Sequence, residues 1–590
     1  MKNRNAFALS LVAAVAVATW AATARAQWQA CGVPTCVNPA NQYLPAAASD
    51  NAGGVIIAWA DHRVTTPTGT ARWMIYAQRL NNLGIPQWAA DGVQVAPDSA
   101  VADTAFDQQN PVIVADGSGG AFIAWVDGRD HPYTDIYLQH INSSGAPTWL
   151  PLGGGLGVCK APNVQQNPAL VLDGSGGVIV AWQDCRNGTN FDIYAQRVDG
   201  SGAPQWTTNG VPLCLAPDGQ TGPQMISDGN HGAYVVWTDN RNAPDLDLFC
   251  QDVTGSGQVK WMTNGLQAFG VVGYAYTGPQ QNPAIVSDGA GGLILVCEDG
   301  RNGANFDIWA QRIDPSGARL WPDTLGADGY AVITANNNQT APSACGDGAG
   351  GVIVSWMDFR RGNNLDPDLY IQHLNAAGAP QWGAVTVGDT VCIQGGSQQY
   401  PNVVPDGAGG AVVTWDDGRL GTSMYAQRFN AAGAAQWVAE GVATCGMTYG
   451  PIAHSTISDG AGGAIFAWQD GRTNTNTDIY AGHVSGGGTV TGAAGVDDAT
   501  RGGGLVLEGP RPNPAPAGMS VRFTLPTDHA ATLDLVDVSG RLLERHDVGR
   551  LGAGAHDVEL GRGATLHAGL YFVRLRQDGV SRYQKATVIP

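Results

Sequence analysis

The chain has 590 residues, including 82 Gly and 33 Pro, and only 14% of its residues are charged. This length exceeds one simple domain, and the glycine and proline content predicts an all-β protein with many turns rather than long helices. The hydrophobic content of 44% excludes a disordered chain, and the formal net charge of −19 argues against a nucleic-acid partner, because binding phosphates needs clustered Lys and Arg.

Residues 1–26 have the pattern of a cleaved export signal. Lys2 and Arg4 precede an apolar run over 6–22, and the Ala-Arg-Ala sequence at 24–26 supplies the small residues that a signal peptidase needs. A membrane anchor is the alternative, but the run is short and ends at a cleavage-like site. We therefore predict a secreted or cell-surface bacterial protein with no transmembrane segment after cleavage.

A unit of 53 to 66 residues repeats eight times between residues 27 and 484. Each copy has an Asp-Gly-x-Gly-Gly turn, an apolar strand that ends in Trp-x-Asp-x-Arg, a second strand and a Gly-x-x-x-Trp ending; residues 173–206 show it best. Cys297 replaces the Trp in one copy. The repeated residues are Trp59, Asp61, Arg63, Trp125, Asp127, Arg129, Trp182, Asp184, Arg186, Trp237, Asp239, Arg241, Asp299, Arg301, Trp356, Asp358, Arg360, Trp415, Asp417, Arg419, Trp468, Asp470 and Arg472.

Four short strands per unit are typical of a β-propeller blade, although a solenoid could use the same unit. The ends of the array favour a ring. The last unit lacks its Trp strand, while 27–36 matches 205–214 at Trp, Gly, Val, Pro and Cys. We therefore predict an eight-bladed propeller over 27–484, in which the N-terminal segment supplies the outer strand of the last blade and covers an exposed edge.

Residues 485–504 have the composition of a flexible linker, and 505–590 contain short strands between Gly turns, which predict a small β-sandwich. Pro512-Asn-Pro514, the turn at 537–541, Ala553–His556 and Ala568–Val573 resemble, in that order, the C-terminal sorting domains of type IX-secreted bacterial proteins and the Ig-like domain of flagellar hook-assembly proteins. The resemblance implies export across an outer membrane, contact with secretion machinery, and release or attachment at the cell surface.

The eight Asp/Arg pairs are interpreted as structural, because an active site needs one constellation rather than a copy in every unit. Each Asp-Gly turn offers one carboxylate, too few for the six to eight oxygens around calcium. We therefore predict no cofactor, and calcium binding at these turns is the alternative. Gly202–Trp206 resembles part of the tryptophan-docking motif of quinoprotein dehydrogenases. Without the rest of that motif, docking of one blade on the next by Trp is favoured.

Three histidines, His140, His373 and His483, fall in the repeat position that other units fill with Arg, and are interpreted as variants of that position. His62 and His131 lie in equivalent loops and could meet.

The chain has ten cysteines. Equivalent positions in neighbouring blades about 10 Å apart are too distant for a disulfide, so the sequence allows both buried thiols and disulfide bridges.

Binding loops are expected where the copies differ. Two stretches, 64–73 and 268–276, depart from the repeat, and their candidate ligand contacts are Arg72, Trp73, Tyr274 and Tyr276. Aromatic packing between blades is the alternative role of these residues.

The favoured function is non-enzymatic binding of a glycan or protein ligand at the blade loops. The alternatives are a glycan-processing hydrolase or lyase and a quinoprotein-like oxidoreductase.

Overall fold

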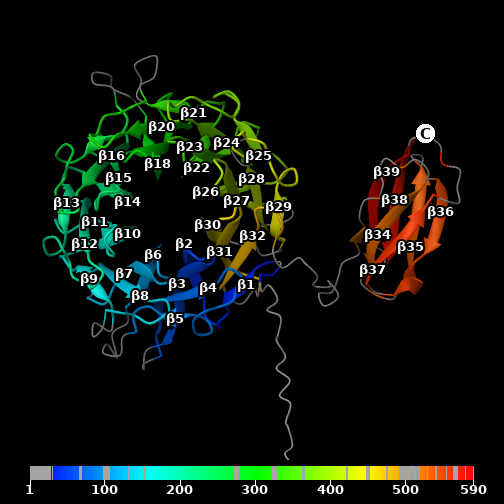
Figure 1. Cartoon of the computed structure of the whole chain (residues 1–590), viewed down its shortest axis with the longest axis horizontal. Helices are drawn as coiled ribbons and strands as arrows, with labels where there is room; N and C mark the ends of the chain where they lie inside the picture. The colour runs from blue at the N-terminus through cyan, green and yellow to red at the C-terminus, as the bar shows by residue number, and fades with distance from the viewer. Residues whose placement is uncertain are drawn as a thin grey trace, which may run out of the picture. The chain divides into compact units, whose positions relative to one another are not determined.

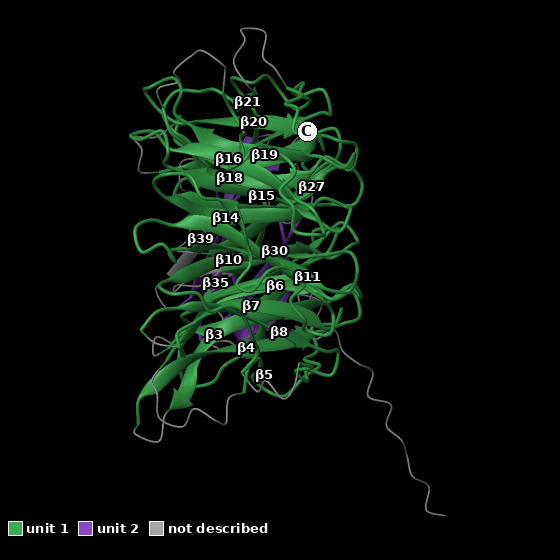
Figure 2. Ribbon diagram, turned by 90° about the vertical axis from the view of Figure 1, so that its left-hand side faces the viewer, with its two compact units in different colours: residues 1–492 green, residues 493–590 purple. Residues whose placement is uncertain are grey.

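The computed structural model describes residues 28–490 and 506–588. The undescribed positions within these ranges are 30, 66–68, 98–105, 131, 150–153, 271–277, 322–328, 362–365, 420–422, 447–451, 473–475, 508–509, 511–514, 516–517, 526, 528, 538–540, 553, 562–565, 567–568 and 578–579. The predicted signal at 1–26 lies outside them. The chain divides into two compact units, residues 1–492 and 493–590 (Figure 2).

The described part of the first unit folds into eight four-stranded antiparallel sheets, which confirms the all-β class. Sheets 1 to 7 each pair four consecutive strands: β2 (Gln42–Ser49), β3 (Val55–Thr65), β4 (Ala71–Leu80), β5 (Val93–Gln94); β6 (Gln108–Ala115), β7 (Ala121–Asp127), β8 (Asp135–Ile141), β9 (Leu156–Cys159); β10 (Gln165–Leu172), β11 (Val178–Asp184), β12 (Asp192–Val198), β13 (Val211–Cys214); β14 (Gln220–Ser227), β15 (Ala233–Asp239), β16 (Asp247–Val253), β17 (Leu266–Gln267); β18 (Gln280–Ser287), β19 (Leu293–Asp299), β20 (Asp307–Ile313), β21 (Tyr330–Ile333); β22 (Gln339–Gly346), β23 (Val352–Asp358), β24 (Asp368–Leu374), β25 (Asp389–Cys392); β26 (Gln398–Pro405), β27 (Ala411–Asp417), β28 (Ser423–Phe429), β29 (Val442–Gly446).

Sheet 8 combines the two ends of the first unit. It has the order β1-β32-β31-β30, where β1 is Val33–Cys36, β30 is Ile452–Ser458, β31 is Ala464–Asp470 and β32 is Asp478–Val484. Val33 pairs with Ala481. Figure 1 shows the eight sheets arranged in a ring, with β2 of sheet 1 beside β30 of sheet 8.

The second strand of each sheet forms the core, because neighbouring sheets cover both of its faces. Every residue of β11 is buried, in keeping with its apolar sequence. The turn before it is fixed by Asp173, whose Oδ1 accepts hydrogen bonds from the backbone N–H groups of Ser175 (2.7 Å) and Gly177 (2.8 Å). Gly174 and Gly176 have φ angles of 68° and 86°, which explains the glycines of the repeat.

A tryptophan at the end of each unit joins neighbouring sheets. Its indole Nε1–H donates to a backbone carbonyl of the next sheet, and the bond from Trp28 to Asn82 (2.9 Å) runs from sheet 8 to sheet 1. The other seven bonds run from Trp88 to Ser143, Trp149 to Gly200, Trp206 to Gly255, Trp261 to Pro315, Trp321 to Ala376, Trp382 to Ala431 and Trp437 to Gly486.

The predicted linker begins later than residue 485. Ser485 N–H donates to Thr489 O, and Val490 forms a β-bridge with Val484, so 485–490 are a turn of sheet 8. The Gly-rich composition misled here, because the same residues are needed for the repeat's own turn. The rest of the predicted linker, 491–504, lies outside the described residues.

The second unit contains two sheets around one core. One has the order β33 (Val506–Leu507), β34 (Met519–Leu525), β37 (Gly554–Leu560), and the other β36 (Leu542–Asp547), β35 (Ala531–Asp537), β38 (Gly569–Gln577), β39 (Val580–Val588), with the short 3-10 helix η2 (Gly549–Leu551) between strands. Phe523 and Val573, one from each sheet, are fully buried in the shared core. In the part of the chain that the structure describes, no helix could cross a membrane.

Candidate functional site

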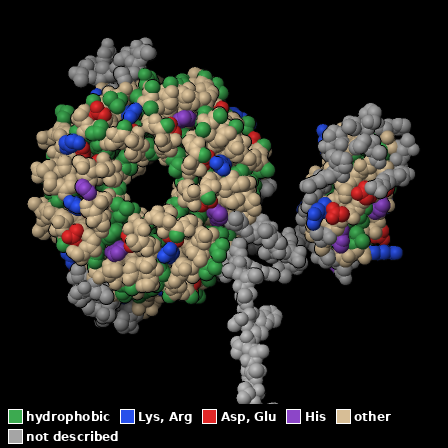
Figure 3. Space-filling model, in the orientation of Figure 1, with side chains coloured by type: hydrophobic (Ala, Val, Ile, Leu, Met, Phe, Trp, Pro, Cys, Tyr) green, Lys and Arg blue, Asp and Glu red, His purple; other side chains and the backbone are tan. Residues whose placement is uncertain are grey.

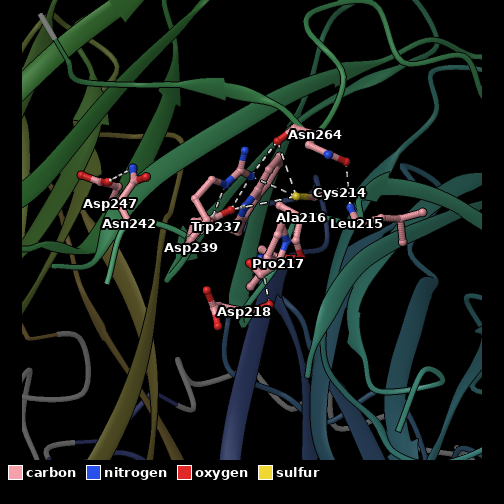
Figure 4. Close-up of polar contacts among 12 residues, drawn as sticks. Cys214, Leu215, Ala216, Pro217, Asp218, Trp237, Asp239, Asn242, Asp247 and Asn264 are labelled. Atoms are coloured by element: carbon pink, nitrogen blue, oxygen red, sulfur yellow. Dashed lines mark hydrogen bonds and ion pairs between the residues drawn. The ribbon is translucent and has the colours of Figure 1, made fainter. Parts of the chain in front are cut away.

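The repeated Trp, Asp and Arg form a buried cluster, shown for one unit in Figure 4. Trp237 Nε1 donates to Asp239 Oδ2 (2.8 Å), Arg241 Nε donates to Asp239 Oδ1 (2.8 Å), and Arg241 Nη2 reaches the carbonyl of Asn264 (2.8 Å). Asp239 is 0% exposed, and the guanidinium lies 3.8 Å from the ring centre of Phe249. Both carboxylate oxygens are thus occupied inside the protein, which leaves no position for a ligand.

The same cluster reaches the outer strand of the preceding sheet. Arg241 Nη2 lies 3.1 Å from Cys214 Sγ on β13, and Asn264 Oδ1 accepts a hydrogen bond from Leu215 N (2.9 Å). Burial raises the pKa of the Cys214 thiol to about 11, so it is neutral at physiological pH. The cluster therefore joins two sheets and presents no reactive group.

The unit with Cys297 keeps the Asp–Arg ion pair, but it has no Trp on the second strand and has a Trp on the third strand instead. Arg301 Nε donates to Asp299 Oδ1 (2.8 Å), as in the other units. Its guanidinium lies 3.6 Å from the ring centre of Trp309 on β20, where most other units have Tyr. Burial holds the pKa of the Cys297 thiol well above its usual range. Cys297 is therefore a buried substitute for Trp and lacks the features of a nucleophile.

In all the sheets of the first unit except sheet 4, the turn carboxylate contacts an Arg or His side chain on the third strand of its own sheet. Arg197 Nε donates to Asp173 Oδ2 (2.8 Å), and His140 Nε2 lies 2.9 Å from Asp116 Oδ2. His373 and His483 contact Asp347 and Asp459 in the same way, which confirms that these histidines are variants of the repeat's Arg position. Within the described residues, no group of three or more His, Cys, Asp or Glu side chains could hold a metal ion.

The first predicted binding stretch lies on a hairpin that is longer than its counterparts. β3 and β4 have 11 and 10 residues, against seven in the equivalent strands of most sheets. Arg72 is only 8% exposed, and its guanidinium lies 5.1 Å from the Phe106 ring centre. Trp73 is half-buried and stacks on His62 (4.4 Å) and against Tyr43 (5.0 Å). Trp73 thus retains a partly open aromatic surface, whereas Arg72 is largely withdrawn from solvent.

Residues 271–276 of the second predicted stretch, 268–276, lie outside the described residues. Tyr274 and Tyr276 lie outside the described residues, as does His131, the proposed neighbour of His62. Phe269, at the start of this stretch, is 2% exposed and packs in the core between sheets 4 and 5.

A polar cleft of about 730 Å³ lies between sheets 5 and 6, and its position was not predicted from the sequence. Four segments form it: the turn after β19, the segment after β21, the turn after β23 and the segment between β24 and β25. Asp307 provides the only carboxylate among the described residues of its wall. The lining residues are Asn302, Asn305, Asp307, Thr334, Ala335, Asn336, Arg360, Arg361 and Thr386.

Asp307 is held in place by amides. Asn302 Nδ2 donates to its Oδ2 (2.7 Å), and burial raises its pKa to about 6. The equivalent Asp192 and Asp368 are raised to about 6 by the same cause. The shift therefore belongs to the repeat position, and the distinctive feature of the cleft is the gathering of Asn, Thr and Arg around it. The run of three Asn at 336–338 and the Arg doublet at 360–361 are the sequence signals that could have located it.

Sheets of four antiparallel strands, repeated around a ring, place the first unit in the β-propeller class. No protein-family model matches the chain, and no curated protein matches it. Among solved structures it is similar to an α-L-arabinanase of Penicillium chrysogenum in complex with arabinobiose, with 12% identity over 77% of this chain and 96% of that chain and a TM-score of 0.29.

Two further solved structures show a similar degree of likeness. A protein of Dyadobacter fermentans is 9% identical, with 77% of this chain and 97% of that chain covered and a TM-score of 0.32. A GH93 α-L-arabinofuranosidase of Fusarium graminearum in complex with arabinobiose is 11% identical, with 64% and 91% covered and a TM-score of 0.31.

Proposed function

We propose that the first unit is a closed eight-bladed β-propeller that binds a neutral, hydroxyl-rich ligand such as a glycan, without processing it. The observation that carries this proposal is the chemistry of the cleft between sheets 5 and 6. Its amide and hydroxyl groups and the exposed guanidinium of Arg361 suit sugar hydroxyls, which both donate and accept hydrogen bonds. Charged side chains are scattered on the face in view in Figure 3, which suits a neutral ligand better than a strongly charged one.

Ring closure is supported by the two junctions of sheet 8. Trp437 of sheet 7 donates to Gly486 O (3.1 Å), and Trp28 beside β1 donates to Asn82 O of sheet 1 (2.9 Å). The series of indole-to-carbonyl bonds therefore returns to its starting sheet. An open solenoid would leave one of these partners unmatched.

A glycan-processing hydrolase is the second candidate. The raised pKa of Asp307 is a property of general acids in glycosidases. Glycosidases of the usual kind, however, place a second carboxyl about 5 to 9.5 Å from the first, and the described cleft wall offers only Asp307. This shortage favours binding over hydrolysis.

The test is a screen of the purified full chain against a polysaccharide panel that includes arabinan, with binding and sugar release measured in parallel. We expect binding without release, and a roughly tenfold or greater loss of affinity in Asn305→Ala. Asn190→Ala is the matched control, because Asn190 has the same repeat position and likewise donates from Nδ2 to a backbone carbonyl. Sugar release by the wild type that disappears in Asp307→Asn would favour the hydrolase; equal losses in the two Asn variants would contradict a site in this cleft.

The second unit is proposed to be an Ig-like sorting domain that contacts secretion machinery and delivers the chain to the cell surface or medium. Its two sheets around one core fit such a sandwich. Removal of 505–590 should leave the propeller inside the cell envelope of a type IX-secreting bacterium, as judged by fractionation. Unchanged appearance in the medium would contradict this role.

A further inference from the structure

Four junctions between sheets share one contact beside a cysteine. In each, a residue with positive φ just before the outer strand of one sheet accepts a hydrogen bond from the backbone N–H that follows a Cys on the preceding sheet. The Arg of the buried Trp, Asp and Arg cluster donates to the backbone carbonyl of the same positive-φ residue, for example Arg186 to Asn209 O (2.8 Å). The N–H contacts are Val37 to Asp91 (3.0 Å), Lys160 to Asn209 (3.0 Å), Leu215 to Asn264 (2.9 Å) and Ile393 to Glu440 (2.9 Å).

At the junction of sheets 7 and 8, Cys31 occupies this position. It has a φ of 61°, and Arg472 Nη2 donates to its carbonyl (3.0 Å). The preceding sheet contributes Cys445 of β29, which corresponds to Cys214 and its equivalents. Two cysteines therefore meet where the four other junctions have one cysteine beside Asp, Asn or Glu.

The two thiols are in contact and withdrawn from solvent. The side chains of Cys31 and Cys445 interact directly, and this contact, together with burial, holds the pKa of Cys445 well above its usual range. Cys31 is 9% exposed and Cys445 is 2% exposed. Equivalent cysteines on neighbouring outer strands, such as Cys36 and Cys445, are too distant to bridge. Cys31 is not such an equivalent: it lies five positions before Cys36, in the turn where the Gly32 N–H donates to Gln29 O.

We propose that Cys31 and Cys445 form a disulfide that fastens the N-terminal segment to sheet 7. The oxidant is a protein or small-molecule disulfide: one thiolate attacks it, releasing a thiol, and the second thiolate resolves the mixed disulfide. The protein loses two electrons and two protons, and the oxidant is reduced to two thiols. Because both sulfurs are buried in the folded unit, the exchange takes place before the N-terminal segment has docked.

This bridge reinforces a short pairing. The N-terminal segment is held in sheet 8 by the four-residue strand β1, whose detachment would expose the edge of β32. A covalent link at residue 31 keeps β1 beside β32 even when the hydrogen bonds open. The site is independent of the ligand cleft, so it stands or falls separately from the proposed binding function.

The test is alkylation of the full chain, expressed with export to an oxidising compartment, under denaturing conditions, followed by peptide mass spectrometry. None of the ten cysteines, all of which the structure describes, is bridged in the structure. We expect eight alkylated cysteines and one linked peptide pair containing Cys31 and Cys445. Ten alkylated cysteines, or a linked pair formed by other residues, would overturn the proposal.

A second measurement follows the unfolding temperature with and without reductant. Reductant should lower the unfolding temperature of the wild type and of Cys214→Ser, which keeps both proposed partners. It should leave the unfolding temperatures of Cys31→Ser and Cys445→Ser unchanged. An equal response to reductant in the wild type and in Cys31→Ser would overturn the bridge.

Discussion

At the residue scale, buried Asp–Arg pairs determine how neighbouring sheets meet. Asp239 receives the indole N–H of Trp237 and two groups of Arg241, and its side chain is fully buried. A buried ion pair adds modest net stability, but removing one partner leaves an uncompensated charge. The pair is therefore more important as a constraint than as a source of stability.

Asp239→Ala should lower the free energy of unfolding by about 3–5 kcal/mol, because it leaves Arg241 buried without its carboxylate. Chemical denaturation measures the change. Asp199→Ala is the control: Asp199 accepts turn hydrogen bonds near the surface, and its loss should cost about 1 kcal/mol. A similar small loss in both variants would contradict the role of the cluster.

The pH dependence of stability follows from the aspartates that open the third strands. Burial raises the pKa of Asp192, Asp307, Asp368 and Asp478 to about 6, above the usual value of about 3.9. The folded state therefore binds more protons than the unfolded state between about pH 4 and 6, and stability falls as pH rises through this window. The unfolding temperature should be higher at pH 5 than at pH 8.

Asp192→Asn should reduce this difference, because the amide cannot titrate. Below about pH 4 the trend reverses, since Asp173 and Asp470, whose pKa values are lowered by their hydrogen bonds and Arg partners in spite of burial, lose stabilisation as pH falls through their folded pKa. An unfolding temperature that rises steadily from pH 5 to pH 8 would refute the role of the buried aspartates.

At the element scale, the turn before the outer strand depends on a glycine beside the core Trp in seven of the eight sheets of the first unit. Gly210 has a φ of 85°, and a Cβ there would lie 2.5 Å from Trp182 and 2.7 Å from Ala195 O. Both contacts are too short for a carbon atom. The outer strand can therefore approach the second strand's Trp only through glycine.

Gly210→Ala should lower the free energy of unfolding by roughly 2–4 kcal/mol, combining the cost of positive φ with that of overpacking. Gly219→Ala is the matched control, since a Cβ added there would meet no atom within 4 Å and its φ is not in the left-handed region. Thermal and chemical unfolding of the two variants should differ clearly. Equal stability would show that the turn can relax around the added methyl group.

At the scale of the whole first unit, the sequence predicts the repeat better than the site. Trp, Asp, Arg and Gly recur because every sheet needs the same turn and the same cluster, and Gln27–Cys36 matches the outer strand closely enough to be placed in sheet 8. The cleft was not predicted, because its wall combines four segments of two sheets and has no periodic pattern. The burial of Arg72 and the meeting of Cys31 with Cys445 likewise depend on contacts between distant segments.

Ring closure by the N-terminal segment is the central claim about the whole unit, and deletion of residues 27–36 tests it most directly. We expect a marked fall in the unfolding temperature of the first unit, because β32 loses its partner and Trp28 no longer reaches sheet 1. A synthetic peptide of residues 27–41, added to the shortened chain, should restore much of the loss by pairing with β32. An unfolding temperature unaffected by both the deletion and the peptide would contradict closure.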